Sequence, residues 1–327
     1  MKLNPWKNKG LAGGLARLLK GREAGPSVKR AGLEMIPLFG GIHREYAPPE
    51  TALELEQVTD YGRMILKNRS RKWTIVPLHM GYFQFGAQNH AMCRSYILKP
   101  GERKEFKDAA CIQAAQGGYI KEADRRFIVL PQPLRGRALA LKGVKEYGKL
   151  WKDIERFNQS LGLKHRGHLD ELKQARQPEL LRTVYFLETQ PEQTGAVFLN
   201  RGRVVGLELA PGPGFWKELH LPLVMYCYGP LRLHGEPVES PAGDERRSGT
   251  FAGARTPDEV ETLLREMREA RMEMTRSLLR GLGEVSMKAK REQSAGEHEL
   301  FTIDAGEFRG QAVLREGEPA YVSLTAV

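Results

Sequence analysis

The stretch Pro77–His90, PLHMGYFQFGAQNH, joins an apolar segment to a turn that is rich in glycine and carboxamide side chains. The run Trp73–Leu78 leads into it with the composition of a strand, and a second apolar run, Ala91–Leu98, follows it. Glycine allows the backbone to approach a ligand or a neighbour closely, and adjacent carboxamides bind a polar ligand or cap a turn. We therefore expect two strands around a turn that is either a ligand site or a structural cap.

The composition bounds the class of protein. The 327 residues, 41% hydrophobic and 28% charged, are typical of a globular protein with one large domain or two modest ones. The longest apolar run, Leu221–Tyr228, is too short to span a bilayer, and no signal-peptide pattern opens the chain. The cysteines are Cys93, Cys111 and Cys227, too few and too widely spaced for a disulfide framework or a metal site. We expect a cytoplasmic protein with no cofactor and no metal.

The positive charge is concentrated at the N-terminus. The chain carries +11, of which residues 1–30 contribute +7, so the remainder is close to neutral. This basic arm also has leucines at helical spacing, Leu11, Leu15, Leu18 and Leu19. The pattern indicates an amphipathic helix for a membrane surface, nucleic acid or a partner, or one that packs on its own domain. The sequence alone leaves these alternatives open.

Hydrophobic periodicity and turn signals predict strands in the first third of the chain, with one short helix. The predicted helix is Ala52–Val58. Ile65–Lys67 and Trp73–Leu78 are predicted to form a hairpin around Asn68–Ser70. The other predicted strands are Leu33–Phe39, Met92–Leu98 and Glu105–Gln113. Pairing of the last two across Pro100–Gly101 would bring Gln113 and Gln116 to the glycine-bearing turn.

The middle of the chain has helical periodicity and the end returns to strands. The predicted helices are Ala138–Leu161, His168–Gln177, one that begins near Phe215 and one after Thr256. The predicted strands are Thr183–Glu188, the hairpin Gly195–Leu199 with Arg203–Ala210, and the closing runs Leu300–Phe308 and Gln311–Leu324. The fold class is α+β: strand-rich N- and C-terminal portions around a helical middle, in one composite domain with a basic N-terminal arm. The expected divisions are the arm 1–30, a body 31–235, a linker or exposed loop 236–255, an inserted amphipathic helix 256–297 and closing strands 298–327 that complete the body.

The helix after Thr256 has the clearest start signal in the chain. Thr256 is placed as its N-cap, Pro257 at the first position and Glu259 at the capping-box position. Apolar residues then recur on one side: Val260, Leu263, Leu264, Met267, Met274, Leu278 and Leu279. This stripe is either core-facing or an adaptable surface for a partner.

No motif in the sequence fixes a chemistry. A Walker loop, a zinc-ligand cluster, a nucleophile elbow and HExxH are all absent. The candidate ligand-binding residues are Tyr82, Gln88, Asn89, His90, Gln113 and Gln116. His90 is either ligand-facing or a structural hydrogen-bonding residue, and nothing near Cys111 in the sequence would activate its thiol. The loop 211–214, PGPG, either cradles a phosphate at a helix start or is a rigid turn.

A succession of segments resembles a bacterial domain family named for its association with ADP-ribosylglycohydrolase and rhodanese-phosphatase superfamily genes. The similar segments are GLEMIPLFG (Gly32–Gly40), ILKNRSRKWTIVPL (Ile65–Leu78), FGAQNH (Phe85–His90), SYILKPGERKEF (Ser95–Phe106), ACIQAAQGGY (Ala110–Tyr119), GAVFLNRGRVVGLEL (Gly195–Leu209) and FRGQAVLREGEPAYVSL (Phe308–Leu324). They cover nearly the whole body in the family's order. The basic arm and residues 236–297 look like additions to it.

This chain departs from the family pattern at charged positions. Members have an acidic pair ahead of the glycines, where this chain has Gly81–Gln84. They have Gly-Gly-Lys-Gln-Asn-Arg where this chain has Phe85–His90, and Cys-Val-Glu where it has Cys111–Gln113. A histidine is usual near Tyr321. Chemistry on a phosphate-bearing nucleotide needs a general base or a charge clamp, and both are replaced here.

The resemblance implies a cytoplasmic protein linked to NAD and ADP-ribose metabolism. Because Gln88 and Asn89 match the family and the charged residues do not, binding of a nucleotide-type ligand is favoured over its transformation, and enzymatic activity stays open. The alternative is a non-enzymatic interaction or assembly protein that docks a protein partner through residues 1–30 and 256–290. Nucleic-acid binding rests on the charge of the arm alone.

Overall fold

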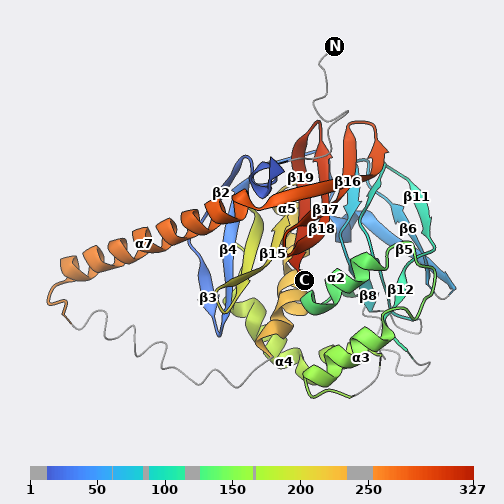
Figure 1. The fold of residues 1–327 in the computed structure, drawn as a ribbon, viewed down its shortest axis with the longest axis horizontal. Helices are drawn as coiled ribbons and strands as arrows, with labels where there is room; N and C mark the ends of the chain where they lie inside the picture. The colour runs from blue at the N-terminus through green and yellow to red at the C-terminus, as the bar shows by residue number, and fades with distance from the viewer. Residues whose placement is uncertain (1–12, 61, 84–87, 115–125, 165–166, 234–252) are drawn as a thin grey trace, which may run out of the picture.

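The computed structural model describes residues 13–60, 62–83, 88–114, 126–164, 167–233 and 253–327, and its fold is α+β (Figure 1). The largest element is an antiparallel ten-stranded sheet in the order β1-β16-β17-β18-β19-β15-β14-β4-β2, with β3 also paired to β4. Its strands are β1 (Gly13–Gly14), β2 (Arg22–Ala24), β3 (Val28–Arg30), β4 (Leu33–Gly40), β14 (Gln193–Asn200), β15 (Arg203–Leu209), β16 (Ser286–Ala295), β17 (His298–Ala305), β18 (Phe308–Arg315) and β19 (Glu318–Ala326). Segments from the start, middle and end of the chain therefore build one sheet.

Three smaller antiparallel sheets lie in the first half of the chain. One contains β5 (Leu53–Asp60), β6 (Arg63–Asn68) and β11 (Arg103–Phe106), and a second contains β7 (Thr74–Val76) and β10 (Tyr96–Leu98). The third has the order β12-β9-β8-β13, built from β8 (Met80–Phe83), β9 (His90–Ala91), β12 (Ala110–Cys111) and β13 (Arg126–Val129). This third sheet carries part of the stretch Pro77–His90, in β8 and β9.

The helices pack around these sheets. They are η1 (Leu15–Arg17), α1 (Pro49–Ala52), α2 (Gln132–Ala140), α3 (Trp151–Ser160), α4 (Asp170–Phe186), α5 (Pro213–Pro222) and α7 (Pro257–Glu284). α5 continues without a break into the π-helical segment η2 (Leu223–Tyr228) and the 3-10 turn η3 (Gly229–Arg232). π-helical turns are rare in proteins and recur at functional or strained places.

The large sheet buries both of its faces because its strands alternate apolar side chains. On β14, Val197 packs into a cluster with Leu15 and Leu18, whereas Phe198 packs into the main core with Trp216. A third apolar cluster joins α2, α3 and α4 to the β12-β9-β8-β13 sheet. The site region therefore lies between this small sheet and the helical middle.

Several sequence predictions are confirmed. The strand Leu33–Phe39 corresponds to β4, the hairpin around Asn200–Gly202 to β14 and β15, and the helix near Phe215 to α5. α7 begins as predicted, with the Thr256 side chain accepting from the Glu259 backbone in a complete capping box. These are the places where local signals and tertiary structure agree.

Two predictions in the first third are wrong. Residues 52–58 are not a helix: α1 ends at Ala52 and β5 follows, because the alternating Leu-Glu-Leu-Glu of residues 53–56 buries Leu53 and Leu55 on one face. The strands around Asn68–Ser70 do not pair with each other, since β6 pairs with β5 and β11 while β7 pairs with β10. The turn is instead held by the Asn68 side chain, which donates to the carbonyls of Lys72 and Lys99.

The helical middle also differs from the prediction. Ala138–Leu161 is divided into α2 and α3, with Gly143 at φ +77° and the Lys149 ammonium donating to the carbonyls of Asp108, Leu141 and Val144. Lys149 is therefore buried rather than solvated. Such long-range contacts override a helical period, and no local signal reveals them.

Two further strand predictions fail or change. Of the predicted strand 183–188, residues 183–186 form the end of α4. Leu172, Leu180 and Thr183 of this helix are buried, so tertiary packing extends it past Pro178. Of the two strands predicted around Pro100–Gly101, Met92–Leu98 is a strand only at β10, and Glu105–Gln113 is divided between the end of β11 and β12.

The described part of the basic arm packs on its own domain. Leu15 and Leu18 have no solvent exposure and contact the apolar cluster that includes Leu282 of α7. Leu11 lies outside the described residues. In the part of the chain that the structure describes, no helix combines the length and the apolar composition needed to cross a membrane.

Candidate functional site

The β12-β9-β8-β13 sheet brings most of the predicted site residues together. Tyr82 on β8 is opposite His90 on β9, and His90 is in turn opposite Cys111 on β12. The pairing expected to bring Gln113 to the turn therefore occurs through β9 and β12 rather than directly across Pro100–Gly101. Gln116 lies outside the described residues.

His90 is a buried structural link. Its Nδ1 lies 3.0 Å from the Gln88 carbonyl, and its Nε2 accepts a hydrogen bond from the Gly62 backbone N–H at 3.0 Å. This pattern assigns the proton to Nδ1, and burial lowers the pKa of His90, so the ring is neutral near pH 7. Gly62 has φ +77°, and a Cβ there would come within 3.1 Å of the Ala109 carbonyl, so the position requires glycine.

Cys111 orients the Gln88 carboxamide. Its Sγ lies 3.0 Å from Gln88 Oε1 and 3.1 Å from the Gln113 carbonyl. Burial raises the pKa of the Cys111 thiol, so it is a hydrogen-bonding group and not an activated nucleophile. The Oε1 of Gln88 is thereby directed inward, toward the thiol.

Gln113 is the member of this group with an unused donor. Its Oε1 accepts a long hydrogen bond, 3.4 Å, from the Asn89 backbone N–H. Its Nε2 is buried and has no hydrogen-bond partner among the described residues. A buried N–H₂ group without an acceptor costs roughly 1–3 kcal/mol, so its presence requires a reason. We refer to Gln88, Asn89, His90, Cys111 and Gln113 together as the amide cluster.

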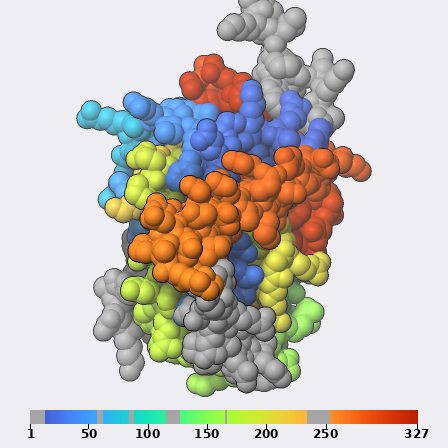
Figure 2. Space-filling model, turned by 90° about the vertical axis from the view of Figure 1, so that its left-hand side faces the viewer, coloured from blue at the N-terminus to red at the C-terminus, as the bar shows by residue number. Residues whose placement is uncertain are grey.

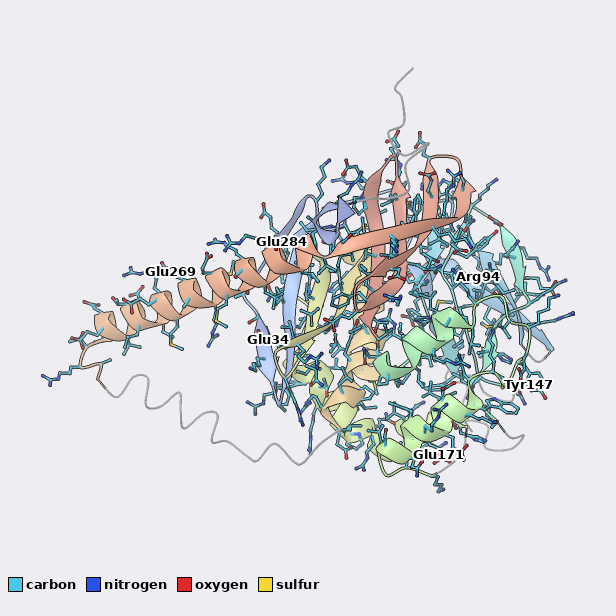
Figure 3. The ribbon with its side chains drawn as sticks, in the orientation of Figure 1. Glu34, Arg94, Tyr147, Glu171, Glu269 and Glu284 are labelled. Carbon is cyan, nitrogen blue, oxygen red and sulfur yellow. The ribbon has the colours of Figure 1, made fainter. Side chains whose placement is uncertain are left out.

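Aromatic rings border the amide cluster. Tyr147 is 39% exposed, its backbone carbonyl accepts from the Cys111 N–H at 2.8 Å, and its ring meets Trp151 edge-on at 5.3 Å. Figure 3 shows Tyr147 near the molecular surface, beside the start of α3. Tyr82 is buried and faces Phe127 at a ring distance of 6.5 Å, so it belongs to the core next to the cluster.

The segment before α4 adds residues that are not among the candidates from the sequence. His168 is buried, its backbone bridges to Gln113, and its carbonyl accepts from Asn158 Nδ2 at 2.8 Å. His168 Nδ1 lies 3.9 Å from Asp170 Oδ1, and burial raises the pKa of Asp170. The burial of His168 results from its bridge to Gln113, in the segment after β12. A polar sequence at a helix start does not predict such a contact.

A second polar group lies in the core, centred on Arg135 of α2. Its guanidinium donates to Glu208 Oε1 at 2.5 Å, to His79 Nδ1 at 3.1 Å, and to the hydroxyls of Tyr228, at 3.2 Å, and Ser323. Tyr228 in turn donates to Glu208 Oε1 at 2.7 Å. We call this set the arginine network. It joins α2, β15, β19 and the π-helical segment, which come from separate parts of the sequence.

The arginine network is charged and fully enclosed. Arg135, Glu208 and His79 are at most 1% exposed. Burial opposes the charged guanidinium, but the Glu208 carboxylate outweighs it and raises the pKa of Arg135, whereas burial and Arg135 together lower that of His79. His79 also has φ +62°, a strained conformation for a side chain of this size. Glu208 Oε2 and His79 Nε2 have no partner among the described residues.

The remaining candidates are structural or absent. The 211–214 loop starts α5 with Pro213, which has no N–H to offer a phosphate, and the Pro211 carbonyl accepts from the His43 N–H at 2.7 Å. The 211–214 loop is therefore a rigid turn at the start of α5. Within the described ranges, no cluster of histidine, cysteine and carboxylate side chains could hold a metal ion.

The fold and the amide cluster define an α+β protein with a neutral, amide-rich polar site beside an exposed aromatic ring. Residues 22–327 match the model of one family, the ARG and Rhodanese-Phosphatase-superfamily-associated Protein domain. The chain belongs to this family. The name records an association with ADP-ribosylglycohydrolase and rhodanese-phosphatase genes. Searches of curated proteins and of solved structures give no significant match.

Proposed function

We propose that this protein binds a nucleotide-type ligand of the ADP-ribose or NAD class at the amide cluster. The observation that carries the proposal is the Gln113 Nε2 donor, which is buried and has no partner among the described residues. Donors of this kind suit the hydroxyl and phosphate oxygens of such a ligand. The association of the family with ADP-ribosylglycohydrolase genes supplies the ligand class.

Tyr147 supplies a complementary contact in this proposal. Tyr147 is 39% exposed and its backbone carbonyl accepts from the Cys111 N–H, so an aromatic residue is fixed next to the amides. A nucleobase can stack on such a ring, and stacking contributes about 1–3 kcal/mol per base in nucleic-acid complexes. The base would then lie at the surface, with the sugar and phosphates directed toward Gln88 and Gln113.

The chemistry of the cluster supports binding over catalysis. His90 uses both ring nitrogens in structural hydrogen bonds, and the thiol of Cys111 has a raised pKa. A general base needs a free lone pair near the substrate, and a nucleophile needs a lowered pKa. Neither residue meets its requirement.

Thermal stabilisation by ADP-ribose and NAD tests the proposal. The free energy of unfolding should rise with the logarithm of ligand concentration, by about 2.7 kcal/mol at one hundred times the dissociation constant. Gln88→Ala and Gln113→Leu should each weaken binding about tenfold, since each removes a polar contact. Tyr147→Ala should weaken it similarly, and Tyr147→Phe should not.

Gln159→Ala is the matched control, because Gln159 is an exposed carboxamide on α3 outside the amide cluster. It should bind ligand as the unaltered protein does. Equal stabilisation of Gln113→Leu and the unaltered protein would place binding elsewhere. No stabilisation of the unaltered protein by either nucleotide would exclude this ligand class.

A further inference from the structure

α7 extends well beyond the body of the protein (Figure 1), with Glu284 at the body end and Glu269 on the projecting part (Figure 3). Only its C-terminal part is packed: Thr275 and Leu282 are buried, the latter in the cluster that contains Leu15. Figure 2 shows α7 on the near surface of the molecule. Among the described residues, the projecting part has no buried side chain, although isolated helices of that length are marginal in water.

The projecting part nevertheless has an apolar stripe. Val260, Met267 and Met274 follow at intervals of seven, with Leu263 and Ala270 between them in the alternating three- and four-residue spacing of heptad positions a and d. This heptad stripe does not continue into the body contact, because Met274 is 73% exposed while the adjacent Thr275 is buried. The first three residues of the stripe are half-buried and the last two are exposed. A 3.5-residue apolar repeat that is not part of the core is the pattern of a helix that pairs with another helix.

Charges beside the stripe select the partner and its direction. Glu266 is at a g position and Arg271 at the following e position, and neither has an ion pair within its own chain among the described residues. In a parallel pair of identical helices, each Glu266 meets the Arg271 of the other copy. An antiparallel pair that sets Met267 against Ala270 would instead bring Glu266 against Glu273, which is repulsive.

We propose that α7 pairs in parallel with α7 of a second copy of this chain, through the heptad stripe. The remaining flanking positions place no like charges together in this register: they match Glu259 with Leu264 and Glu273 with Leu278. Leu264, 38% exposed in the single chain, widens the apolar contact. The stripe is only about two heptads long, so the dimer is expected to dissociate on dilution. This inference is independent of the ligand proposed above.

Sedimentation velocity of the full chain over a range of concentrations tests the pairing. The unaltered protein should approach the mass of a dimer at high concentration, and Met267→Glu should make it monomeric by placing two carboxylates in the seam. Thr262→Glu is the control, an added carboxylate on the same helix away from the stripe, and it should remain dimeric. Circular dichroism establishes that each variant is folded. A monomer at every concentration would overturn the proposal.

Charge reversal distinguishes the two directions. Glu266→Arg should weaken a parallel dimer about threefold to tenfold, because the introduced guanidinium would face Arg271 of the other copy, and Arg271→Glu should weaken it for the same reason. An equimolar mixture of the two variants should restore association, since each copy then supplies the charge that the other needs. Stronger association of Glu266→Arg alone would indicate the antiparallel pair and refute the parallel one.

Discussion

The molecule contains two buried polar groups that differ in charge. The arginine network surrounds an ion pair, Arg135 with Glu208, and engages every donor nitrogen of the guanidinium. The amide cluster contains neutral groups joined by hydrogen bonds, and it leaves Gln113 Nε2 without a partner among the described residues. Glu208 Oε2 and His79 Nε2 also lack a partner among the described residues, so the two groups differ in charge and not in the presence of an unused polar atom. A buried ion pair that joins several elements is typical of a structural junction, whereas a neutral polar cluster is compatible with a ligand site.

The energetic consequence is a difference in what each group tolerates. Removing one member of a buried ion pair leaves an uncompensated charge and costs about 3–5 kcal/mol. Removing one neutral hydrogen bond typically costs about 1 kcal/mol. The predictions below use stability measurements to separate the two groups, from the largest effect to the smallest.

Arg135→Met should destabilise the protein by about 3–5 kcal/mol, because Glu208 would remain buried without its counter-ion. The loss is measured as the change in the urea midpoint at constant m-value. Arg137→Met is the matched control on the same helix. The Arg137 side chain is mostly exposed, and its Nε lies 3.6 Å from Asp153 Oδ2, so the loss of this ion pair should cost less than about 1 kcal/mol.

The double variant Arg135→Met with Glu208→Leu sharpens this comparison. It removes both charges together, so part of the stability lost in Arg135→Met should return. If the single and double variants are equally unstable, the cost lies in packing around the guanidinium and not in the unpaired carboxylate. A cost of Arg135→Met no greater than that of Arg137→Met would contradict the structural role of the network.

The contrast also shows what the sequence can predict. Gln88, Asn89 and His90 are site candidates because they are contiguous in a glycine-bearing turn, and the α+β class followed from periodicity. Arg135 and Glu208 are 73 residues apart and lie in an unremarkable helix and strand, so no local pattern joins them. The strand β5 and the divided helix at 138–161 were missed for a related reason: pairing with β6 and the carbonyl contacts of the Lys149 ammonium are tertiary.

Acid should destabilise both groups through their histidines. The pKa values of His79 and His90 are lowered in the folded state, mainly by burial, so below pH 6.5 the unfolded chain binds more protons than the folded one. The contribution of these two histidines to the free energy of unfolding is therefore fully present above pH 6.5. It is lost as the pH falls toward their pKa values in the folded state. Each such histidine contributes a slope of up to about 1.4 kcal/mol per pH unit. Urea unfolding between about pH 7.5 and pH 5, the range in which histidine titrates, measures it.

Replacing His79 or His90 singly shows how much each group contributes to the pH dependence of stability. His90→Gln and His79→Gln should each make the stability less dependent on pH, and His79 should retain its effect to lower pH because its pKa is lowered further, by burial and by Arg135. His43, His220 and His298 also have lowered pKa values, so a residual slope is expected in both variants. An unchanged slope in His90→Gln would show that its ring is accessible to protons in the folded state.

Gln113→Leu should have the smallest effect on stability, within about 1 kcal/mol of zero, because it removes one long hydrogen bond and one buried unused donor together. A residue kept for a ligand rather than for the fold commonly behaves in this way, since binding sites retain groups that do not stabilise the free protein. The measurement is the urea midpoint without ligand, paired with nucleotide binding by the same variant. Loss of binding at unchanged stability would place Gln113 among the ligand contacts. A cost near that of Arg135→Met would instead make the amide cluster a second structural junction, and the distinction between the two groups would not hold.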